Sequence, residues 1–541
     1  MGETTKTVAV IGCGVTGLTA IKCCLDEGLQ PTCFEASDTI GGLWVYRENA
    51  DFEMTGSVFK SSVTNTSKEA MCYSDFPFPK EWPNFLRNSY VKKYCELYAE
   101  KFGLRQHIRF STKVTRLAQA PDYDTTGRWV VTTARKTLNS SEVDASYQAE
   151  TNQEFDAVMI CTGMFNNPNR PQFPGLDEFQ GKVIHSHDYR NPKGFDDKRV
   201  VVIGFGNSAV DAAVDFSRCT SQVFLSTRRG AWLVSRRADN GFPHDLMYMK
   251  RRNFLVSKIR DLSFKKMLHD RYELINNPLR PFGDLKTCSN RIVNEELPGN
   301  ILNGSVIIKT TPVLFTKTGV KFQDGSFEDN IDVVILATGY RFTFPFDVDC
   351  PALEIDPRQG RVPLYKLLFP LGTKHHTLSV NGAIEPLGPV IPCVELQARW
   401  ASRVFKGLAK LPSQFVMASE SLETMDGFVV PCERHVNHVS YSDFIASEIG
   451  VMPSLWKLFL TDPGLAMRCF FGPHVPYQYR LVGPGKWDGA KEAINTVWER
   501  VLEPTKTRYG GTEATSRFML FLLVGIIVIL VLVIIAARFL F

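Results

Sequence analysis

Two glycine-rich stretches of similar spacing could bind the phosphates of a cofactor. The first follows an apolar run expected to form a buried strand at 8–11 and reads G-x-G-x-x-G, with Gly12, Gly14 and Gly17. Glycines at this spacing allow a tight strand-to-helix turn, close approach of a pyrophosphate and close packing of helix on sheet. The phosphates then lie at the helix N-terminus. The pattern predicts a dinucleotide site, and Glu35, after a second expected strand at 31–34, is placed to accept from a ribose hydroxyl.

A second copy of this pattern begins with an expected strand at 198–203. Gly204, Gly206 and Ala209 form G-x-G-x-x-A, and an apolar helix and a strand at 222–225 follow. Alanine in the third position is tolerated by this fingerprint. The chain is therefore predicted to contain two dinucleotide-binding units.

The two units differ at the end of their second strand. Where the first has Glu35, the second has Arg228 and Arg229 at nearly the same distance from the first glycine. A carboxylate would repel a 2'-phosphate, whereas guanidinium groups bind it with paired hydrogen bonds. The second site is predicted to prefer NADPH over NADH; the alternative is a solvated basic turn.

Composition excludes several other classes of protein. The 541 residues carry a formal net charge of only +5, without a long basic run, so no nucleic-acid partner is expected. The thirteen cysteines show no C-x-x-C pair and no zinc spacing, so we expect reduced thiols and no metal site. No signal peptide is evident, and the body of the chain should be cytosolic.

An acid-ended site and an arginine-ended site in one chain predict an enzyme that passes a hydride from NADPH to a bound flavin. A disulfide reductase would need a dithiol, which the cysteine spacing does not provide. Molecular oxygen is therefore the expected acceptor of the electrons.

The predicted fold class is α/β, with two Rossmann-like dinucleotide-binding domains, a helical insertion and a C-terminal transmembrane helix. A β-meander is expected around 108–133, helices at 89–102 and 393–408, and central strands at 155–161 and 331–336. The expected division is 1–165 for the first part of the flavin domain, 166–330 for the NADP domain with an insertion at about 231–300, 331–510 for the second part of the flavin domain with a C-terminal helical region, and 511–541 for the anchor.

The apolar run from Phe518 to Ala537 is long enough to cross a bilayer as a helix. A buried core helix is the alternative. Arg517 lies just before the run, so we expect a tail anchor with the basic flank and the catalytic body on the cytosolic side.

The segment FQGKVIHSHDYR closely resembles the signature F-x-G-x-x-x-H-x-x-x-Y/F of flavin-containing monooxygenases, filled by Phe179, Gly181, His185 and Tyr189. The resemblance covers essentially the whole chain, including GGLW, NTSKEAM, GFGNSAVD, STRRGAW, LATGY, ELQARW and GPGKWDGA. The chain looks like a vertebrate-type, microsomal member.

The resemblance implies FAD in the first site, NADPH in the second, and a C4a-hydroperoxyflavin that transfers oxygen to small xenobiotic amines or sulfur compounds. It also implies the endoplasmic reticulum membrane. Asn65 is expected near flavin and nicotinamide as the catalytic residue, and His185 is expected to hold the linker between domains. The cofactor contacts that the resemblance implies are Gly12, Cys13, Gly14, Val15, Thr16, Gly17, Glu35, Leu43, Trp44, Thr64, Asn65 and Thr66 for FAD, and Gly204, Gly206, Ser208, Ala209, Val210, Asp211, Arg228 and Arg229 for NADP.

Some alternatives stay open. Glu385 and Met164 depart from the family's usual Gln and His, which leaves the substrate range and an uncoupled NADPH oxidase open. Baeyer-Villiger oxygenation of ketones is a further alternative, although Tyr189 stands where that class typically has Trp. The intact glycines argue against an inactive scaffold. His187 is expected to be exposed. The oligomeric state stays open, with a homo-oligomer as one possibility.

Overall fold

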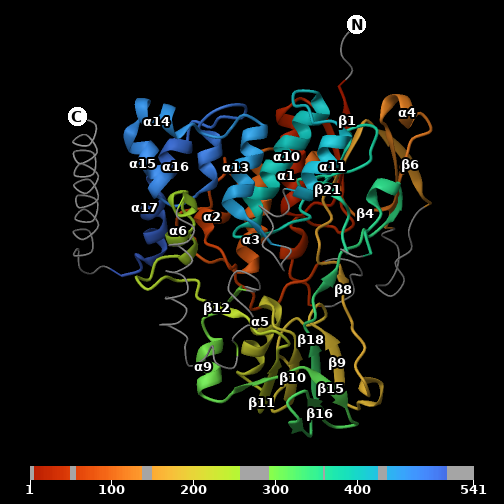
Figure 1. The fold of residues 1–541 in the computed structure, drawn as a ribbon, viewed down its shortest axis with the longest axis vertical. Coiled ribbons are helices and arrows are strands. Elements are labelled where there is room, and N and C mark those ends of the chain that lie inside the picture. Colours follow the sequence, from red (N-terminus) through yellow and green to blue (C-terminus); the bar gives the residue numbers. More distant parts are fainter. Residues whose placement is uncertain are drawn as a thin grey trace.

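In the computed structural model, the described residues are 5–48, 56–136, 149–255, 279, 291–357, 360–423 and 435–508. They form two lobes stacked along the longest axis of the molecule (Figure 1). The upper lobe holds β1, α1 and the C-terminal helices, and the lower lobe holds β10, β11 and α5. Each lobe is built around one parallel sheet.

The upper sheet has the order β23-β7-β1-β2-β3, and all its pairings are parallel. Its strands are β1 (Thr7–Ile11), β2 (Gln30–Phe34), β3 (Ile108–Arg109), β7 (Ala157–Ile160) and β23 (Leu378–Val380). Because β23 comes after the whole lower lobe in the chain, the first nucleotide unit is discontinuous, as predicted.

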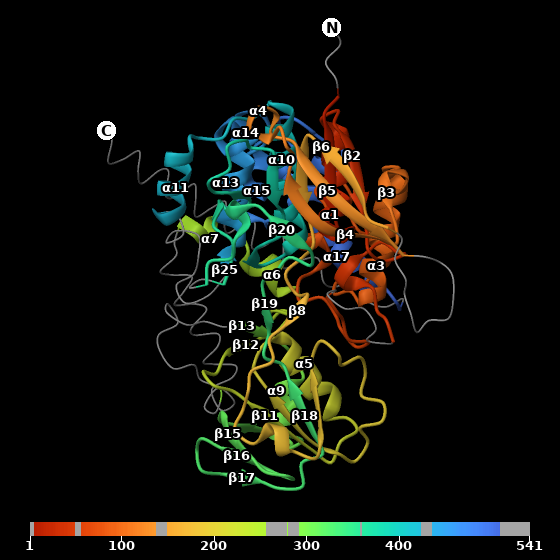
Figure 2. The same ribbon diagram turned by 90° about the vertical axis from the view of Figure 1, so that its right-hand side faces the viewer.

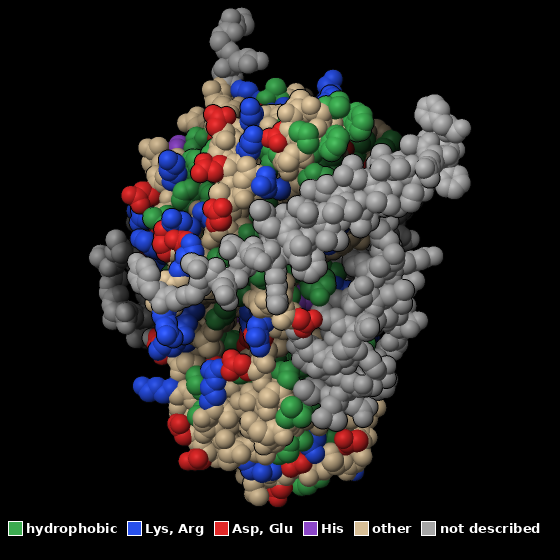
Figure 3. All heavy atoms as spheres, turned by 90° about the vertical axis from the view of Figure 1, so that its left-hand side faces the viewer, with side chains coloured by type: hydrophobic (Ala, Val, Ile, Leu, Met, Phe, Trp, Pro, Cys, Tyr) green, Lys and Arg blue, Asp and Glu red, His purple; other side chains and the backbone are tan. Residues whose placement is uncertain are grey.

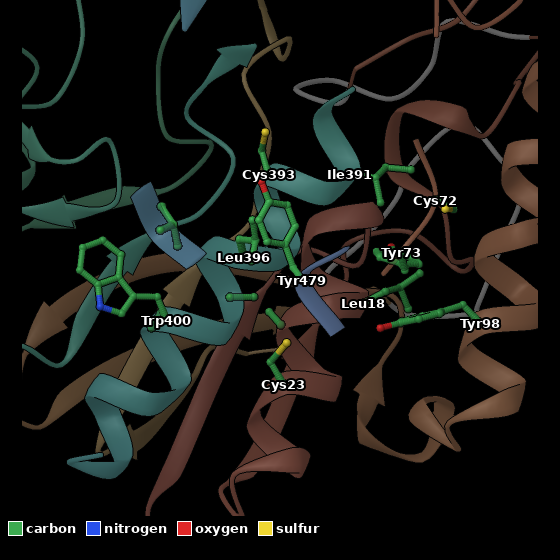
Figure 4. Close-up of a cluster of buried hydrophobic side chains, with 14 of the residues drawn as sticks. Leu18, Cys23, Cys72, Tyr73, Tyr98, Ile391, Cys393, Leu396, Trp400 and Tyr479 are labelled. Carbon is green, nitrogen blue, oxygen red and sulfur yellow. The ribbon is translucent and has the colours of Figure 1, made fainter. Parts of the chain in front are cut away.

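Helix α1 (Val15–Asp26) packs against α10 (Val390–Lys406), the long helix predicted at 393–408. Figure 4 shows Leu18 and Cys23 of α1 beside Leu396 of α10 in this core. All three side chains are buried. Burying this much apolar surface fixes the start of α1 relative to the rest of the upper lobe.

The lower sheet has the order β14-β11-β10-β18-β9, again parallel throughout. Its strands are β9 (Lys182–His185), β10 (Arg199–Ile203), β11 (Gln222–Ser226), β14 (Val306–Lys309) and β18 (Val333–Leu336). The predicted boundary after residue 330 is wrong, because β18 pairs with β10 and β9 and so belongs to the second unit. An apolar strand can complete either sheet, and sequence alone did not distinguish them.

Two further small sheets border these units. The predicted meander is present as β4 (Thr112–Gln119), β5 (Trp129–Arg135) and β6 (Thr151–Phe155), joined by β20 (Asp347–Asp349). A second sheet contains β15 (Pro312–Phe315), β16 (Val320–Phe322) and β17 (Phe327–Glu328). The helix predicted at 89–102 is α3 (Asn88–Lys101).

The chain crosses between the lobes in two paired strands. β8 (Asn167–Pro168) lies antiparallel to β19 (Tyr340–Arg341), and both lie between the lobes (Figure 2). The hydrogen bonds between β8 and β19 hold the two crossing segments side by side.

The predicted insertion at about 231–300 begins and ends with strands. β12 (Trp232–Val234) pairs with β13 (Arg291–Val293), and the described helices are α6 (His244–Tyr248), α7 (Arg252–Leu255) and α9 (Leu297–Leu302). Residues 256–278 and 280–290 lie outside the described residues. Helical structure follows β12, but the prediction missed the two strands.

The C-terminal part is helical, as expected. Its elements are α11 (Gln414–Glu423), α13 (His438–Glu448), α14 (Leu455–Thr461), α15 (Pro463–Phe471), α16 (Ala490–Asn495) and α17 (Val497–Leu502), with β25 (His435–Asn437) paired to β24 (Glu385–Leu387). No helix among the described residues is long and apolar enough to span a membrane. The predicted anchor at 518–537 lies outside the described residues.

Candidate active site

The turn after β1 can be made only by glycine. Gly12 has φ +98°, and a Cβ added there would lie 2.8 Å from the carbonyl oxygen of Cys161. A Cβ on Gly17 would lie 1.8 Å from the carbonyl oxygen of Gly12. These two glycines therefore let α1 start directly at the end of the strand.

The N-terminus of α1 faces a cavity, and no side chain in the described part of the chain caps this end of the helix. Gly14 is the N-cap, no described side chain accepts from the first turn, and this turn has no acidic residue. Gly14 packs against Gly42, where an added Cβ would lie 2.9 Å from the Gly14 Cα atom. Leu43 and Trp44 follow Gly42 on the cavity wall. Unpaired N–H groups and the helix dipole make this end suitable for a pyrophosphate.

Glu35 is buried beside this turn. Its Oε2 accepts from the backbone N–H of Cys13 at 2.7 Å, and its Oε1 accepts from the N–H and hydroxyl of Ser37 at 2.9 and 2.7 Å. A carboxylate offers about four acceptor positions, so one remains for a ribose hydroxyl. The residues of the first site thus fit a dinucleotide.

The lower lobe repeats this construction. Gly204 has φ +121°, and a Cβ there would lie 2.2 Å from the carbonyl oxygen of Ala337. Gly206 is the N-cap of α5 (Asn207–Phe216), and a Cβ there would have no described atom within 4 Å. The helix N-terminus is therefore open to a ligand, as in the first unit.

Arg228 and Arg229 extend into solvent at the end of β11 and line the cavity. Neither makes a hydrogen bond or ion pair within the described part of the chain. Ser208 also lies on the wall, beside Asp211, which accepts from the amide of Asn294 at 3.1 Å. Burial raises the pKa of Asp211 to about 6, against the opposing charge of Arg236.

One cavity of about 2060 Å³ joins the two glycine turns. Pockets for drug-sized ligands have volumes of about 300 to 1000 Å³, so this cavity is large enough for more than one ligand. Met164 and Glu385 also line it. Most predicted cofactor contacts lie on the wall, but three do not: Gly17 packs on Gly12, and Ala209 and Val210 are buried in the core of the lower lobe. The predicted cofactor contacts of these three residues stay predictions, and their packing assigns them the role of holding each helix close to its strand.

Asn65 lies on the cavity wall and is held by a residue that the sequence did not indicate. The Nη2 of Arg236 donates to the Asn65 Oδ1 at 2.9 Å, and the Nε of Arg236 donates to the carbonyl oxygen of Thr64 at 3.0 Å. A guanidinium group has donors only, so it fixes which end of the amide it meets. The NH₂ group of Asn65 must point away from Arg236 as a donor. In the same segment, Asp245 accepts from the N–H and hydroxyl of Ser67 at 2.6 and 2.9 Å.

Thr64 and Thr66 complete this loop. Both line the cavity, but the Thr64 hydroxyl accepts from the N–H of Leu86 at 2.9 Å and donates to the carbonyl oxygen of Thr66 at 3.0 Å. The Thr64 side chain therefore shapes the loop that carries Asn65. No short sequence signal marks Arg236 or Asp245, because both are distant from Asn65 in the chain.

His185 is fully buried at the base of the linkers, where its Nδ1 accepts from the N–H of His187 at 3.0 Å. Burial lowers the pKa of His185 to about 4, so the ring is neutral at pH 7. The predicted exposure of His187 is wrong: it is buried and pairs with Asp188 at 3.1 Å. Tyr189 donates to Asp215, which also accepts from Ser61 of the upper lobe.

Two complete dinucleotide units that share one cavity are typical of a flavoprotein that takes electrons from a nicotinamide cofactor. The family model described as flavin-binding monooxygenase-like matches residues 5–540, and the chain belongs to this family. This confirms the resemblance, the enzymatic nature of the chain and its use of FAD and NADPH.

Individual relatives agree with this assignment. The chain is 44% identical over 518 residues to flavin-containing monooxygenase 5 of Cavia porcellus, covering 93% of this chain and 94% of the relative. It is 44% identical over 513 residues to human dimethylaniline monooxygenase [N-oxide-forming] 4, covering 93% and 89%. Among solved structures, S-allyl-L-cysteine S-oxygenase from Allium sativum shares the fold with a TM-score of 0.62 at 24% identity, covering 92% of this chain and 99% of that one.

Proposed function

We propose that this enzyme uses NADPH and O₂ to oxygenate the nitrogen or sulfur atom of small, soft nucleophiles, releasing NADP⁺, water and the N- or S-oxide. The observation that carries the proposal is the shared cavity. It is lined by one nucleotide unit with Glu35, by a second unit with Arg228 and Arg229, and by the oriented amide of Asn65. When bound, the reduced flavin supplies the electrons that activate O₂.

The glycine turn from Gly12 to Thr16 would hold the FAD pyrophosphate, and Glu35 would accept from its ribose. Leu43 and Trp44 would flank the flavin. In the lower lobe, the N-terminus of α5 would hold the NADP pyrophosphate with Ser208 and Asp211 beside it. Arg228 and Arg229 would pair with the 2'-phosphate, because both are exposed, cationic and on the cavity wall.

Asn65 would donate a hydrogen bond from its NH₂ group into the region between the two cofactors. An amide donates without being acidic enough to transfer a proton, so it can stabilise an electron-rich oxygen without protonating it. His185 would act structurally, since it is buried, neutral and hydrogen-bonded within the linker.

The decisive measurement is oxygen-dependent NADPH consumption by the purified full chain with a tertiary amine, a thioether or a ketone, together with released peroxide. N- or S-oxide formed in proportion to NADPH supports the proposal. An ester formed from the ketone would indicate Baeyer-Villiger oxygenation instead, and peroxide in proportion to NADPH with every substrate would indicate an oxidase.

We further propose that residues 518–537 anchor the enzyme in the endoplasmic reticulum membrane with its body in the cytosol. The uncharged run and Arg517 before it support this orientation. Removing the chain from Arg517 onward should release the enzyme from microsomes. Protease added to sealed microsomes should digest the body, and full protection of the body would contradict the orientation.

A further inference from the structure

Helix α14 exposes large hydrophobic side chains to solvent. Trp456 is 70% exposed, Leu460 67% and Phe459 46%. On its other side, Leu455 and Leu458 pack against the core of the upper lobe. The helix is therefore held to the protein by one side and is apolar on both.

The exposed side chains form one cluster on a well-fixed element. The rings of Trp456 and Phe459 stack with centroids 6.4 Å apart. The Ser454 hydroxyl caps the helix by accepting from the N–H of Lys457, and Asp462 at the other end pairs with Lys491 at 2.7 Å. Single exposed apolar residues need no explanation, but a fixed cluster of this size marks an interaction surface.

The composition of α14 fits a lipid surface. Tryptophan is enriched at the membrane–water interface, and helices that lie in this interface bury Trp, Phe and Leu side chains in it. The helix has one lysine, Lys457, and no carboxylate, so an anionic headgroup would be attracted to it. A lipid surface therefore suits both the apolar cluster and the charge beside it.

The position of α14 points to the same surface. α14, α15, α16 and α17 lie together on one side of the upper lobe (Figure 1), and hydrophobic side chains gather near the upper edge of that side (Figure 3). The described chain ends at Arg508 after α17, and the apolar run begins at Phe518. At about 3.5 Å per residue, the intervening chain reaches at most about 35 Å, so a bilayer holding that run lies within about 35 Å of Arg508, which follows α17 on this side.

We propose that α14 lies on the lipid bilayer, with Trp456, Phe459 and Leu460 inserted between the headgroups and the acyl chains. This second contact rests on the proposed anchoring of the chain. It would restrict how the upper lobe tilts on its single anchor, and so would hold one side of the enzyme against the membrane.

The test uses the full chain reconstituted into phosphatidylcholine and phosphatidylserine vesicles whose acyl chains are brominated near the headgroups. Bromine quenches tryptophan fluorescence on contact. We expect brominated vesicles to quench the wild-type protein more than unbrominated ones, and this difference to fall at least 2-fold in Trp456→Phe. Trp498→Phe is the matched control, because Trp498 is partly buried and packs on Phe242, and it should quench like the wild type.

Equal bromine quenching of the wild type and Trp456→Phe would overturn the proposal. A second copy of the chain that covers α14 in place of lipid would give this result. Flotation of the same vesicles separates this failure from failure of the anchor. A chain that floats without quenching at Trp456 retains the anchor and loses the α14 contact. A chain that does not float contradicts both proposals.

Discussion

Replacing Arg236 with methionine should uncouple NADPH oxidation from oxygen transfer. Methionine keeps much of the apolar stem but removes all donors, so Asn65 loses the group that fixes its amide. The freed amide can turn by 180° and direct its carbonyl oxygen into the cavity. An acceptor in that place repels an electron-rich oxygen instead of stabilising it.

The expected size of the effect follows from the hydrogen bonds that are lost. Arg236 donates to the Asn65 Oδ1 at 2.9 Å and to the Thr64 carbonyl oxygen at 3.0 Å. A hydrogen bond to a charged group contributes about 1.5 to 3 kcal/mol, and loss of one such bond corresponds to about 10- to 100-fold in rate. We therefore expect the yield of oxygenated product per NADPH to fall by about 10-fold or more, with peroxide accounting for the remaining NADPH.

The assay measures NADPH consumed, product formed and peroxide released, with bound FAD and melting temperature recorded for each variant. Arg237→Met is the matched control, because the neighbouring Arg237 extends into solvent and pairs with Glu295 at 3.7 Å; it should stay coupled. Asn65→Ala should uncouple at least as strongly as Arg236→Met. If Asn65→Ala uncouples the enzyme while Arg236→Met with normal FAD content does not, the positioning role of Arg236 is refuted.

Three further predictions concern the cofactor sites. Changing Arg228 and Arg229 together to alanine should raise the KM for NADPH about 10- to 100-fold more than that for NADH, from loss of charge-assisted hydrogen bonds; steady-state kinetics showing equal effects would contradict the assignment. A Cβ at Gly14 would lie 3.6 Å from the Gly42 Cα atom and 4.0 Å from its nitrogen, which are ordinary contacts. Gly14→Val should therefore fold with the melting temperature of the FAD-free wild type yet bind no FAD, and visible absorbance with a full flavin complement would show that no ligand approaches there. Burial raises the folded-state pKa of Asp211 to about 6, so binding of its proton stabilises the fold, and this stabilisation is lost as pH rises from about 4 to 6. Asp211→Asn should remove about 3 kcal/mol of the pH dependence of the unfolding free energy, measured by urea unfolding of the NADPH-free protein. An unchanged dependence of this free energy on pH would count against the raised pKa.

Local patterns were sufficient to predict much of this protein. A strand, a glycine turn and a helix occupy one continuous stretch of chain, so Gly12 and Gly204 could be located, and the positive φ values agree with the predicted turns. Glu35 directly follows β2 and Arg228 lies two residues after β11, and both were found by the same spacing. The physical reason is that short-range sterics and strand order along the chain determine where these residues lie.

Tertiary structure alone decided the features that depend on distant contacts. The strand β18 could have joined either sheet, and its neighbours β10 and β9 were settled by packing. His187 is buried because two linkers meet around it, which no local polarity pattern records. Asn65 and Arg236 come from different parts of the chain, and only the folded insertion brings the guanidinium group to the amide. The sequence by itself therefore determined both glycine turns and the charged residues beside them. The fold determined how the Asn65 amide is oriented, because that orientation depends on a hydrogen bond from Arg236, which is far from Asn65 in the chain.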